Sequence, residues 1–202
     1  MRKVVVNEFL TLDGVAQAPG GAEEDTDGGF AHGGWHMQYM EDEPTQQWVL
    51  ESILEAGGFL LGRRTYEIFA AFWPNAPEEA GGKPLNDATK YVASRGTPLL
   101  TWDRSVQIEG DVAEGVARLK QEDGPELQVH GSGGLIQTLM ANGLIDQYRL
   151  WVFPVVLGTG KRLFADGAIP SALHLTDSTV STTGVVIGTY EPAGEVQTGS
   201  FA

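Results

Sequence analysis

Two segments of the chain pass from a short apolar run through glycine into a helical pattern, and this arrangement constrains the fold most. Phe59-Leu60-Leu61 leads through Gly62 into a helical pattern at 65–72. Leu127-Gln128-Val129 leads through a glycine-rich turn into a helical pattern at 135–142. Strands that alternate with helices in this way form a parallel sheet whose faces are covered by the helices. The pattern therefore predicts an α/β fold.

The rest of the chain extends this prediction. Residues 3–12 indicate a first strand, and apolar residues at mixed three- and four-residue spacings indicate a helix at 41–56 that ends at Gly57-Gly58. From residue 147 onward, runs rich in β-branched residues carry no helix caps, which predicts antiparallel strands. We expect three α/β/α layers around a mostly parallel mixed sheet with antiparallel C-terminal strands. The other expected elements are strands at 91–93, 105–108, 147–157, 172–180 and 184–191, and a helix at 112–120.

The same patterns predict one domain over residues 1–192, since no repeat or linker interrupts them. The polar segment 193–202 is expected to be a flexible tail. Residues 13–34 are rich in Gly, Pro, Asp and Glu and form a long loop. Such a loop is either a lid over a binding site or disordered.

Charge and composition exclude several classes of function. Thirteen basic and 27 acidic residues give a formal charge of −14, which repels nucleic-acid phosphates and anionic lipid headgroups. The chain has no cysteine and therefore no disulfide, thiolate zinc site, iron-sulfur cluster or cysteine nucleophile. No window approaches the ~18 apolar residues of a membrane span, and the apolar run after Met1 is too short for a signal peptide. We therefore expect a cytoplasmic protein without a nucleic-acid or membrane partner.

Two strand ends carry groups that suit phosphate. At the first, Arg63, Arg64 and Thr65 follow Gly62, where a helix start offers backbone N–H groups beside two guanidinium groups. At the second, the turn 130–134 lets backbone amides approach an anion without a side chain in the way. The alternatives are two surface arginines that balance nearby acids and an ordinary strand-to-helix turn.

A third strand end, Tyr91 to Gly96, places Ser94 and Arg95 at the carboxyl edge of the sheet. Open α/β folds bind their ligands at this edge. Because parallel strands bring their carboxyl ends to the same edge, we expect the three strand ends to lie together.

The order of these motifs resembles the dihydrofolate reductase superfamily. The branch that it resembles most is that of the riboflavin-biosynthesis reductase (RibD C-terminal) domain, which the late segment from Phe153 to Phe164 also resembles. The resemblance covers roughly residues 2 to 192 and rests on the ordered set of motifs. The set is Thr11-Leu12-Asp13-Gly14, Leu61-Gly62-Arg63-Arg64-Thr65-Tyr66, Val92-Ala93-Ser94-Arg95 and Val129-His130-Gly131-Ser132-Gly133-Gly134.

This resemblance implies a dihydrofolate-reductase-like fold and an NADPH-dependent reductase, similar to dihydrofolate reductase or to 5-amino-6-(5-phosphoribosylamino)uracil reductase. It implies that the two arginine-bearing corners grip the 2′-phosphate and diphosphate of NADPH and that the glycine turn holds the pyrophosphate. Two arginine clusters fit a phosphorylated ribose better than the acidic residue of NAD sites does. The implied cofactor-binding residues are Gly62, Arg63, Arg64, Thr65, Ser94, Arg95, Gly131, Ser132, Gly133 and Gly134.

Hydride transfer also needs a proton donor, for which the sequence offers candidates. Asp13 is the first, because the family's corresponding Asp-Gly lies beside the nicotinamide and substrate pocket. Its alternative role is to cap the turn before Gly14. Glu8 and Asn7 are candidates that face the pocket from the first strand, and Trp35 is a candidate to stack on a planar heterocycle or to close the lid.

No metal is expected. His32 and His36, with Glu41 nearby, would suggest a metal site only on a helix, and the neighbouring glycines argue against that helix. His130 and His174 are expected to be structural.

The sequence therefore predicts a reductase that transfers a hydride from NADPH to a small planar or carbonyl-bearing substrate, of the pterin or riboflavin-pathway kind. Two alternatives remain open: an NADP(H)-binding module or sensor without turnover, and a flavin-binding reductase. Asn7 stands near the position where the riboflavin branch tends to carry a basic residue for a phosphorylated substrate. The apolar strand at 150–153 suggests edge surface that is buried in an assembly, and members of the family it resembles commonly dimerise, so we expect a homodimer.

Overall fold

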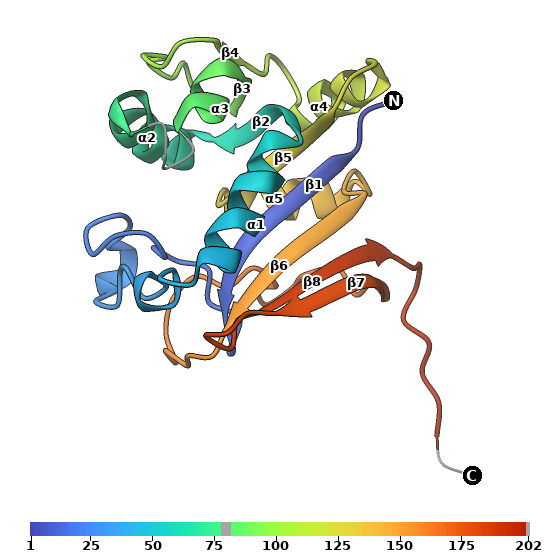
Figure 1. The fold of residues 1–202 in the computed structure, drawn as a ribbon. Helices are drawn as coiled ribbons and strands as arrows, with labels where there is room; N and C mark the ends of the chain where they lie inside the picture. Colours follow the sequence, from blue (N-terminus) through green and yellow to red (C-terminus); the bar gives the residue numbers. More distant parts are fainter. Residues whose placement is uncertain (78–81, 201–202) are drawn as a thin grey trace.

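In the computed structural model, which describes residues 1–77 and 82–200, the strands of these residues form one sheet of eight (Figure 1). Their order across the sheet is β4-β3-β2-β5-β1-β6-β8-β7. Neighbours from β4 to β6 are parallel, and β8 and β7 are antiparallel additions at one edge. The predicted fold class is therefore confirmed. The strands are β1 (Val4–Thr11), β2 (Ala56–Gly62), β3 (Thr89–Ala93), β4 (Ser105–Gln107), β5 (Glu126–His130), β6 (Gln147–Phe153), β7 (Leu173–Val180) and β8 (Val186–Pro192).

Helices cover both faces of the sheet. On one face, α1, α2 and α3 bury side chains such as Ile53, Tyr66 and Leu85 against β2 and β3. On the other, α4 and α5 pack against β1, β2 and β5. The sequence did not predict α3, because six residues are too few to show a helical period. The helices are α1 (Glu43–Leu54), α2 (Arg63–Phe72), α3 (Gly82–Asp87), α4 (Val112–Gln121) and α5 (Gly133–Ala141), with short 3₁₀ segments at Asp27–Gly29, Met37–Tyr39 and Trp73–Asn75.

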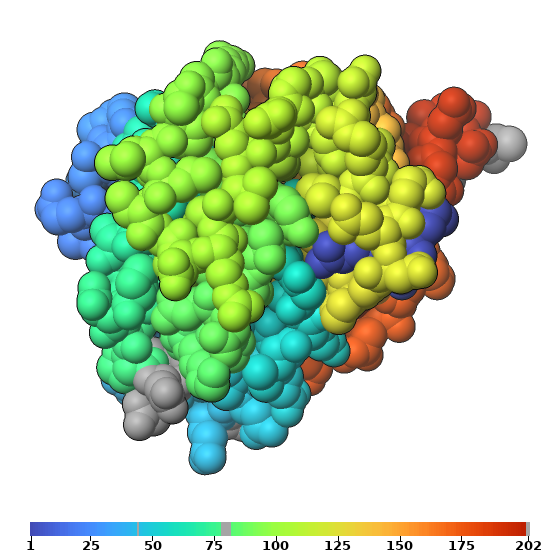
Figure 2. Space-filling model, turned by 90° about the horizontal axis from the view of Figure 1, so that it is seen from above, coloured from blue at the N-terminus to red at the C-terminus, as the bar shows by residue number. Residues whose placement is uncertain are grey.

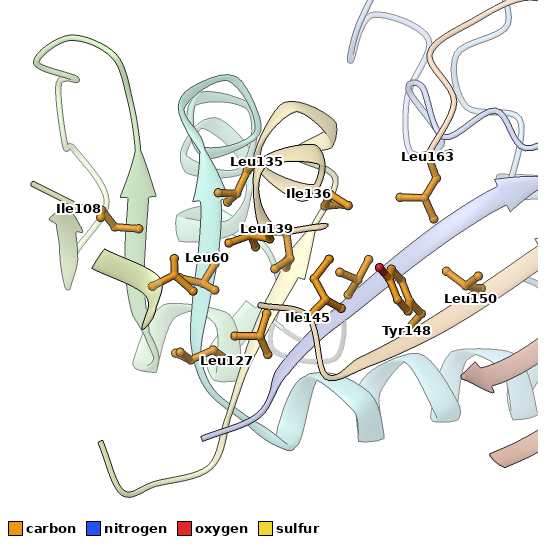
Figure 3. Close-up of a cluster of buried hydrophobic side chains, with 14 of the residues drawn as sticks. Leu60, Ile108, Leu127, Leu135, Ile136, Leu139, Ile145, Tyr148, Leu150 and Leu163 are labelled. Atoms are coloured by element: carbon orange, nitrogen blue, oxygen red, sulfur yellow. The ribbon is translucent and has the colours of Figure 1, made fainter. Parts of the chain in front are cut away.

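The largest core cluster lies between the sheet and the α4–α5 layer (Figure 3). Leu135, Ile136 and Leu139 of α5 point from the helix toward the sheet, where Leu60 and Leu127 meet them. A second cluster lies near the carboxyl end of β1, where residues from the 13–34 loop, including Phe30, pack on β6. This loop is thus packed against the sheet, so its residues have defined positions.

Two predicted boundaries are wrong. Gly57-Gly58 does not end a helix but lies inside β2, while α1 ends at Leu54. A Cβ at Gly57 would come within 3.0 Å of Pro125, so close approach of two chain segments requires glycine there. The predicted strand at 147–157 ends early, at Phe153, because Pro154 has no N–H to donate to a sheet ladder.

The amino end of β1 is held by the segment that precedes β5. Figure 2 shows the start of the chain lying against this segment. The buried Arg2 donates from Nε to the Pro125 carbonyl at 2.8 Å and pairs with Glu122 at 3.7 Å. These contacts fix one end of β1 and leave its other end for the site. Among the described residues, no helix is both long and apolar enough to cross a membrane.

Candidate functional site

The direction in which the helical connections run along the sheet reverses between β5 and β1: β1 connects to β2 on one side, and β5 connects to β6 on the other. The helix that follows β1 packs on one face, and the helix that follows β5 packs on the other. Since β1 and β5 are neighbours, paired at Asn7 and His130, their carboxyl ends lie side by side at this switch in connection. Ligands of open α/β sheets bind at this kind of switch point. The candidate site therefore begins where Glu8 and the turn after His130 face each other.

The turn between β5 and α5 is joined to the start of α2 by two hydrogen bonds. The Gly62 N–H donates to Ser132 Oγ at 2.9 Å, and the Ser132 N–H donates to Thr65 Oγ1 at 2.9 Å. Gly131 has a φ of +52°, and a Cβ there would lie 3.1 Å from Thr65 Oγ1, so glycine fits both the backbone and the space. The starts of two helices are thus fixed beside each other at one edge.

Alanine at Ser132 is expected to lower the free energy of unfolding by about 1–3 kcal/mol, because the Gly62 N–H loses its acceptor. Chemical denaturation measures this change. Alanine at the half-buried Ser94, whose hydroxyl accepts from the Gly96 N–H at 3.2 Å in an exposed hydrogen bond, is the control and should cost less. Equal stability of Ser132→Ala and the wild type would show that the two turns are not coupled.

The third strand end lies next to the first. Ala93 at the end of β3 pairs in register with Gly62, so Ser94 and Arg95 follow at the same edge as Arg63. The ten residues that the sequence proposed for the cofactor therefore lie at or just after the ends of three consecutive strands, β3, β2 and β5. The structure brings these residues together, while their role with a cofactor stays a prediction.

Arg63 and Arg64, the two arginines that follow β2, differ in their ion-pair partners. Arg63 is about two-thirds exposed, with an ion pair to Glu67 at 3.8 Å within α2. Arg64 instead faces the 13–34 loop and forms ion pairs with Asp25, at 2.9 Å, and with Asp27. Both arginines line an open groove of about 390 Å³, whose walls are Glu24, Arg63, Arg64, Glu67 and Ile68.

Glu8 is a buried carboxyl group near the carboxyl end of β1. Its side chain is 5% exposed, and its Oε1 has no hydrogen-bond partner among the described residues. Burial raises the pKa of Glu8 well above its ordinary value, and the charge of Glu24 raises it further, while the Gly131 N–H acts in the opposite direction. Glu8 therefore keeps its proton at pH values where an exposed glutamate has lost it.

Asp13 has the opposite character. It accepts hydrogen bonds from the Thr11 hydroxyl at 2.6 Å and from the Leu157 and Gly158 N–H groups at 3.2 and 2.8 Å. The Thr11 hydroxyl is the main cause that lowers the pKa of Asp13 to about 2. At neutral pH Asp13 is an ionised acceptor that joins two loops, and it has no proton to give.

Trp35 is buried under the 13–34 loop. Its Nε1 donates to the Gln17 carbonyl at 2.8 Å, and its ring packs edge-on against Phe153 with the ring centroids 5.4 Å apart. The side chain is 7% exposed and its donor is used within the protein, which favours a role in closing the loop over stacking on a ligand.

A buried polar network on the α1 face of the sheet was not predicted. The Ser52 hydroxyl donates to Asn7 Oδ1 at 3.0 Å, and His130 Nε2 lies 3.0 Å from Gln128 Oε1. Burial lowers the pKa of His130 to about 4, so this ring is neutral at physiological pH. Polar residues within otherwise apolar strands were the available signal, but only the packing of α1 places Ser52 against them.

Comparison with known proteins gives a family match over nearly the whole chain. A family model described as the RibD C-terminal domain matches residues 2–187. The uncharacterized protein YyaP of Bacillus subtilis (strain 168) is 26% identical over 92% of this chain and 92% of its own length. The uncharacterized protein YwjB of the same organism is 36% identical over 117 residues, which make up 57% of this chain and 63% of YwjB.

Solved structures share the fold. A putative riboflavin biosynthesis protein from Shewanella sp. PV-4 superposes with a TM-score of 0.66 at 18% identity, covering 94% of this chain and 98% of that protein. Dihydrofolate reductase from Enterococcus faecalis, solved with NADP(H) and RAB-propyl, superposes with a TM-score of 0.60 at 14% identity, covering 95% and 96%.

Proposed function

The chain belongs to the RibD C-terminal domain family, and from that membership we propose that it is a cytoplasmic NADPH-dependent reductase of a small planar or carbonyl-bearing compound. The observation that carries the proposal is the convergence of three strand ends at one edge of the sheet. They bring guanidinium groups, a hydroxyl-bearing strand end and two helix starts to the same side of the molecule. This combination suits a ligand with several phosphate groups.

The residues present fit such a dinucleotide. A Cβ at Gly133 or Gly134 would meet no atom within 4 Å, so there is room beside the backbone at the start of α5 for a pyrophosphate. Arg63, Ser94 and Arg95 would hold a 2′-phosphate beside the corner of β2 and α2. NADPH, when bound, supplies the hydride. The glycine turn next to Glu8 would place the reacting end of the cofactor near the carboxyl ends of β1 and β5.

We propose Glu8 as the proton donor in place of Asp13. A donor must carry a proton at the pH of the reaction, which the raised pKa of Glu8 allows and the lowered pKa of Asp13 does not. Glu8 also faces the turn that holds the cofactor in this proposal. Its unpartnered Oε1 is the atom that would hydrogen-bond to the substrate.

The substrate is proposed only by class, as a pterin-like or riboflavin-pathway-like heterocycle. Fluorescence titration with NADPH and NADH, followed by oxidation assays with dihydrofolate, pteridines and riboflavin-pathway ketose substrates, tests the function. Preferred binding of NADPH with turnover of one of these compounds supports a reductase. Tight NADPH binding without turnover would favour a binding module, and a yellow purified protein would favour a flavin enzyme.

We also propose that the protein is a homodimer that pairs through β7 and β8. All eight residues of β7 are exposed. Leu175 and Val180 of β7 and Val186 of β8 present apolar side chains to solvent. In Figure 1 no helix of the described residues covers β7. Within a chain of charge −14, β7 holds a single acid, Asp177, so two copies can approach here with little repulsion.

Lysine at both Leu175 and Val180 is expected to convert the dimer to a monomer, because charge on this strand would face the same charge on the second copy. Light scattering coupled to size-exclusion chromatography measures the mass. Lysine at Leu99, which is 81% exposed in the segment between β3 and β4, at the opposite edge of the sheet from β7, is the matched control and should leave a dimer. A monomeric wild type would contradict this proposal.

A further inference from the structure

Two aspartates of the 13–34 loop form ion pairs with Arg64 at the start of α2. We propose that Asp25 and Asp27 act as an internal anion that competes with a phosphate group of the cofactor for Arg64, so that phosphate binding releases the loop. This inference rests on the proposed function and concerns the regulation of that same site. We call the four side chains Asp25, Asp27, Arg64 and Lys161 the latch.

The latch has defined geometry. Arg64 Nη2 lies 2.9 Å from Asp25 Oδ1, and Arg64 Nη1 pairs with Asp27 Oδ2. Lys161 Nζ approaches the same two carboxylates at 2.7 and 2.8 Å. The buried Gln17 supports them, since its Nε2 donates to the carbonyl groups of Asp25 and Asp27 at 3.0 Å each. Two carboxylates thus use the guanidinium donors that a phosphate would otherwise take.

The latch lies at the proposed phosphate corner. Arg64 is the second residue of α2 and lines the open groove together with Arg63. Glu24, the neighbour of Asp25 in the chain, lines the same groove, where it accepts from the Gly20 and Gly21 N–H groups at 2.6 and 3.1 Å. A phosphate that enters the groove meets this carboxylate as well. Movement of the loop would take Glu24 out of the groove and, at the same time, Asp25 and Asp27 away from Arg64.

The latch can open because its ion pairs are largely at the surface. The side chains of Arg64, Asp27 and Lys161 are about half exposed, and only Asp25 is more buried, at 14%. Exposed ion pairs contribute little stability each and weaken with salt. Lys161 and Arg64 lower the pKa of Asp27, so it remains charged at neutral pH and available to compete. A doubly charged phosphate can therefore exchange for these carboxylates.

Asparagine at both Asp25 and Asp27 tests the proposal. The double variant keeps the shape of the loop but removes the competing charge, so NADPH should bind about tenfold tighter by fluorescence titration. Glu23→Gln removes an acid from the same loop outside the latch and should change the affinity for NADPH by less than about twofold. Unchanged or weaker binding by the double variant, or an equal gain in Glu23→Gln, would overturn the proposal, since a structural role predicts a loss.

Hydrogen exchange of the wild type gives an independent measurement. Inorganic phosphate should speed exchange of the Gly20 and Gly21 amides, compared with chloride at equal ionic strength, because these amides are bonded to Glu24 while the loop is held. NADPH should do the same at lower concentration if it is the ligand. Faster exchange with phosphate but no binding of NADPH would leave the latch standing and reject the proposed cofactor. Binding of NADPH without faster exchange would reject the latch.

Discussion

Alanine at both Arg63 and Arg95 is expected to weaken NADPH binding by about 3–6 kcal/mol and NADH binding much less, because each guanidinium loses a charged hydrogen bond to the 2′-phosphate. Arg63 is the arginine of the first corner with the weaker internal partner, an exposed Glu67 at 3.8 Å. Arg95 follows the strand end that pairs with Gly62. Fluorescence titration of both cofactors against the wild type and the double variant measures the difference.

Arg118 supplies a matched control. It forms the same kind of pair within a helix, with Glu114 at 3.8 Å, and has similar exposure, but it lies on α4 on the other face of the sheet. Arg118→Ala should leave both affinities unchanged. Equal losses for NADPH and NADH in the double variant would point to damage of the fold and would contradict a 2′-phosphate site.

Glutamine at Glu8 is expected to remove a pH dependence of stability. Burial raises the pKa of Glu8 in the folded protein, while in the unfolded chain it stays near 4.5. Between these values the folded protein holds a proton that the unfolded chain has released, so the wild type loses stability as the pH rises, by up to about 1.4 kcal/mol per pH unit. Glu8→Gln is neutral throughout and should lack this loss. Denaturation in urea across the pH range measures it.

The same variant is expected to reduce turnover by about 10²–10⁴-fold with any substrate found, since a general acid is lost. Glu109→Gln, at an exposed position, is the control and should keep the pH dependence of the wild type. Identical slopes for Glu8→Gln and the wild type would mean that Glu8 is ionised in the folded state. It would then have no proton to donate.

The sequence could predict the fold and the edge at which the site lies. Gly62, Ala93 and His130 each end an apolar run, and parallel strands place such ends at one edge. It could not predict which neighbours form the switch point, since β1 and β5 are more than a hundred residues apart. Gly57-Gly58 was misread for a related reason: the contact with Pro125, which requires glycine, is invisible in the local pattern.

The roles of the acids and arginines depend on distant contacts. Asp13 is the first candidate in sequence and Glu8 a further one. The Thr11 hydroxyl, together with the distant N–H groups of Leu157 and Gly158, keeps Asp13 ionised, whereas burial favours the protonated form of Glu8. Arg63 and Arg64 are adjacent, yet of the two it is Arg64 that forms ion pairs with the acidic loop, whereas Arg63 pairs with Glu67 of its own helix. Hydrogen bonds, burial and tertiary ion pairs decide these differences, and residue type and spacing alone do not reveal them.

Amide chemical shifts of the wild-type protein during a titration with NADPH test the convergence of the three strand ends most directly. Saturable changes should concentrate at 62–65, 94–96 and 131–134, with smaller changes around Glu8 and the 13–34 loop. Saturation with the shifts of these turns unmoved, or with the changes gathered on β7 and β8, would contradict a dinucleotide site at this edge of the sheet.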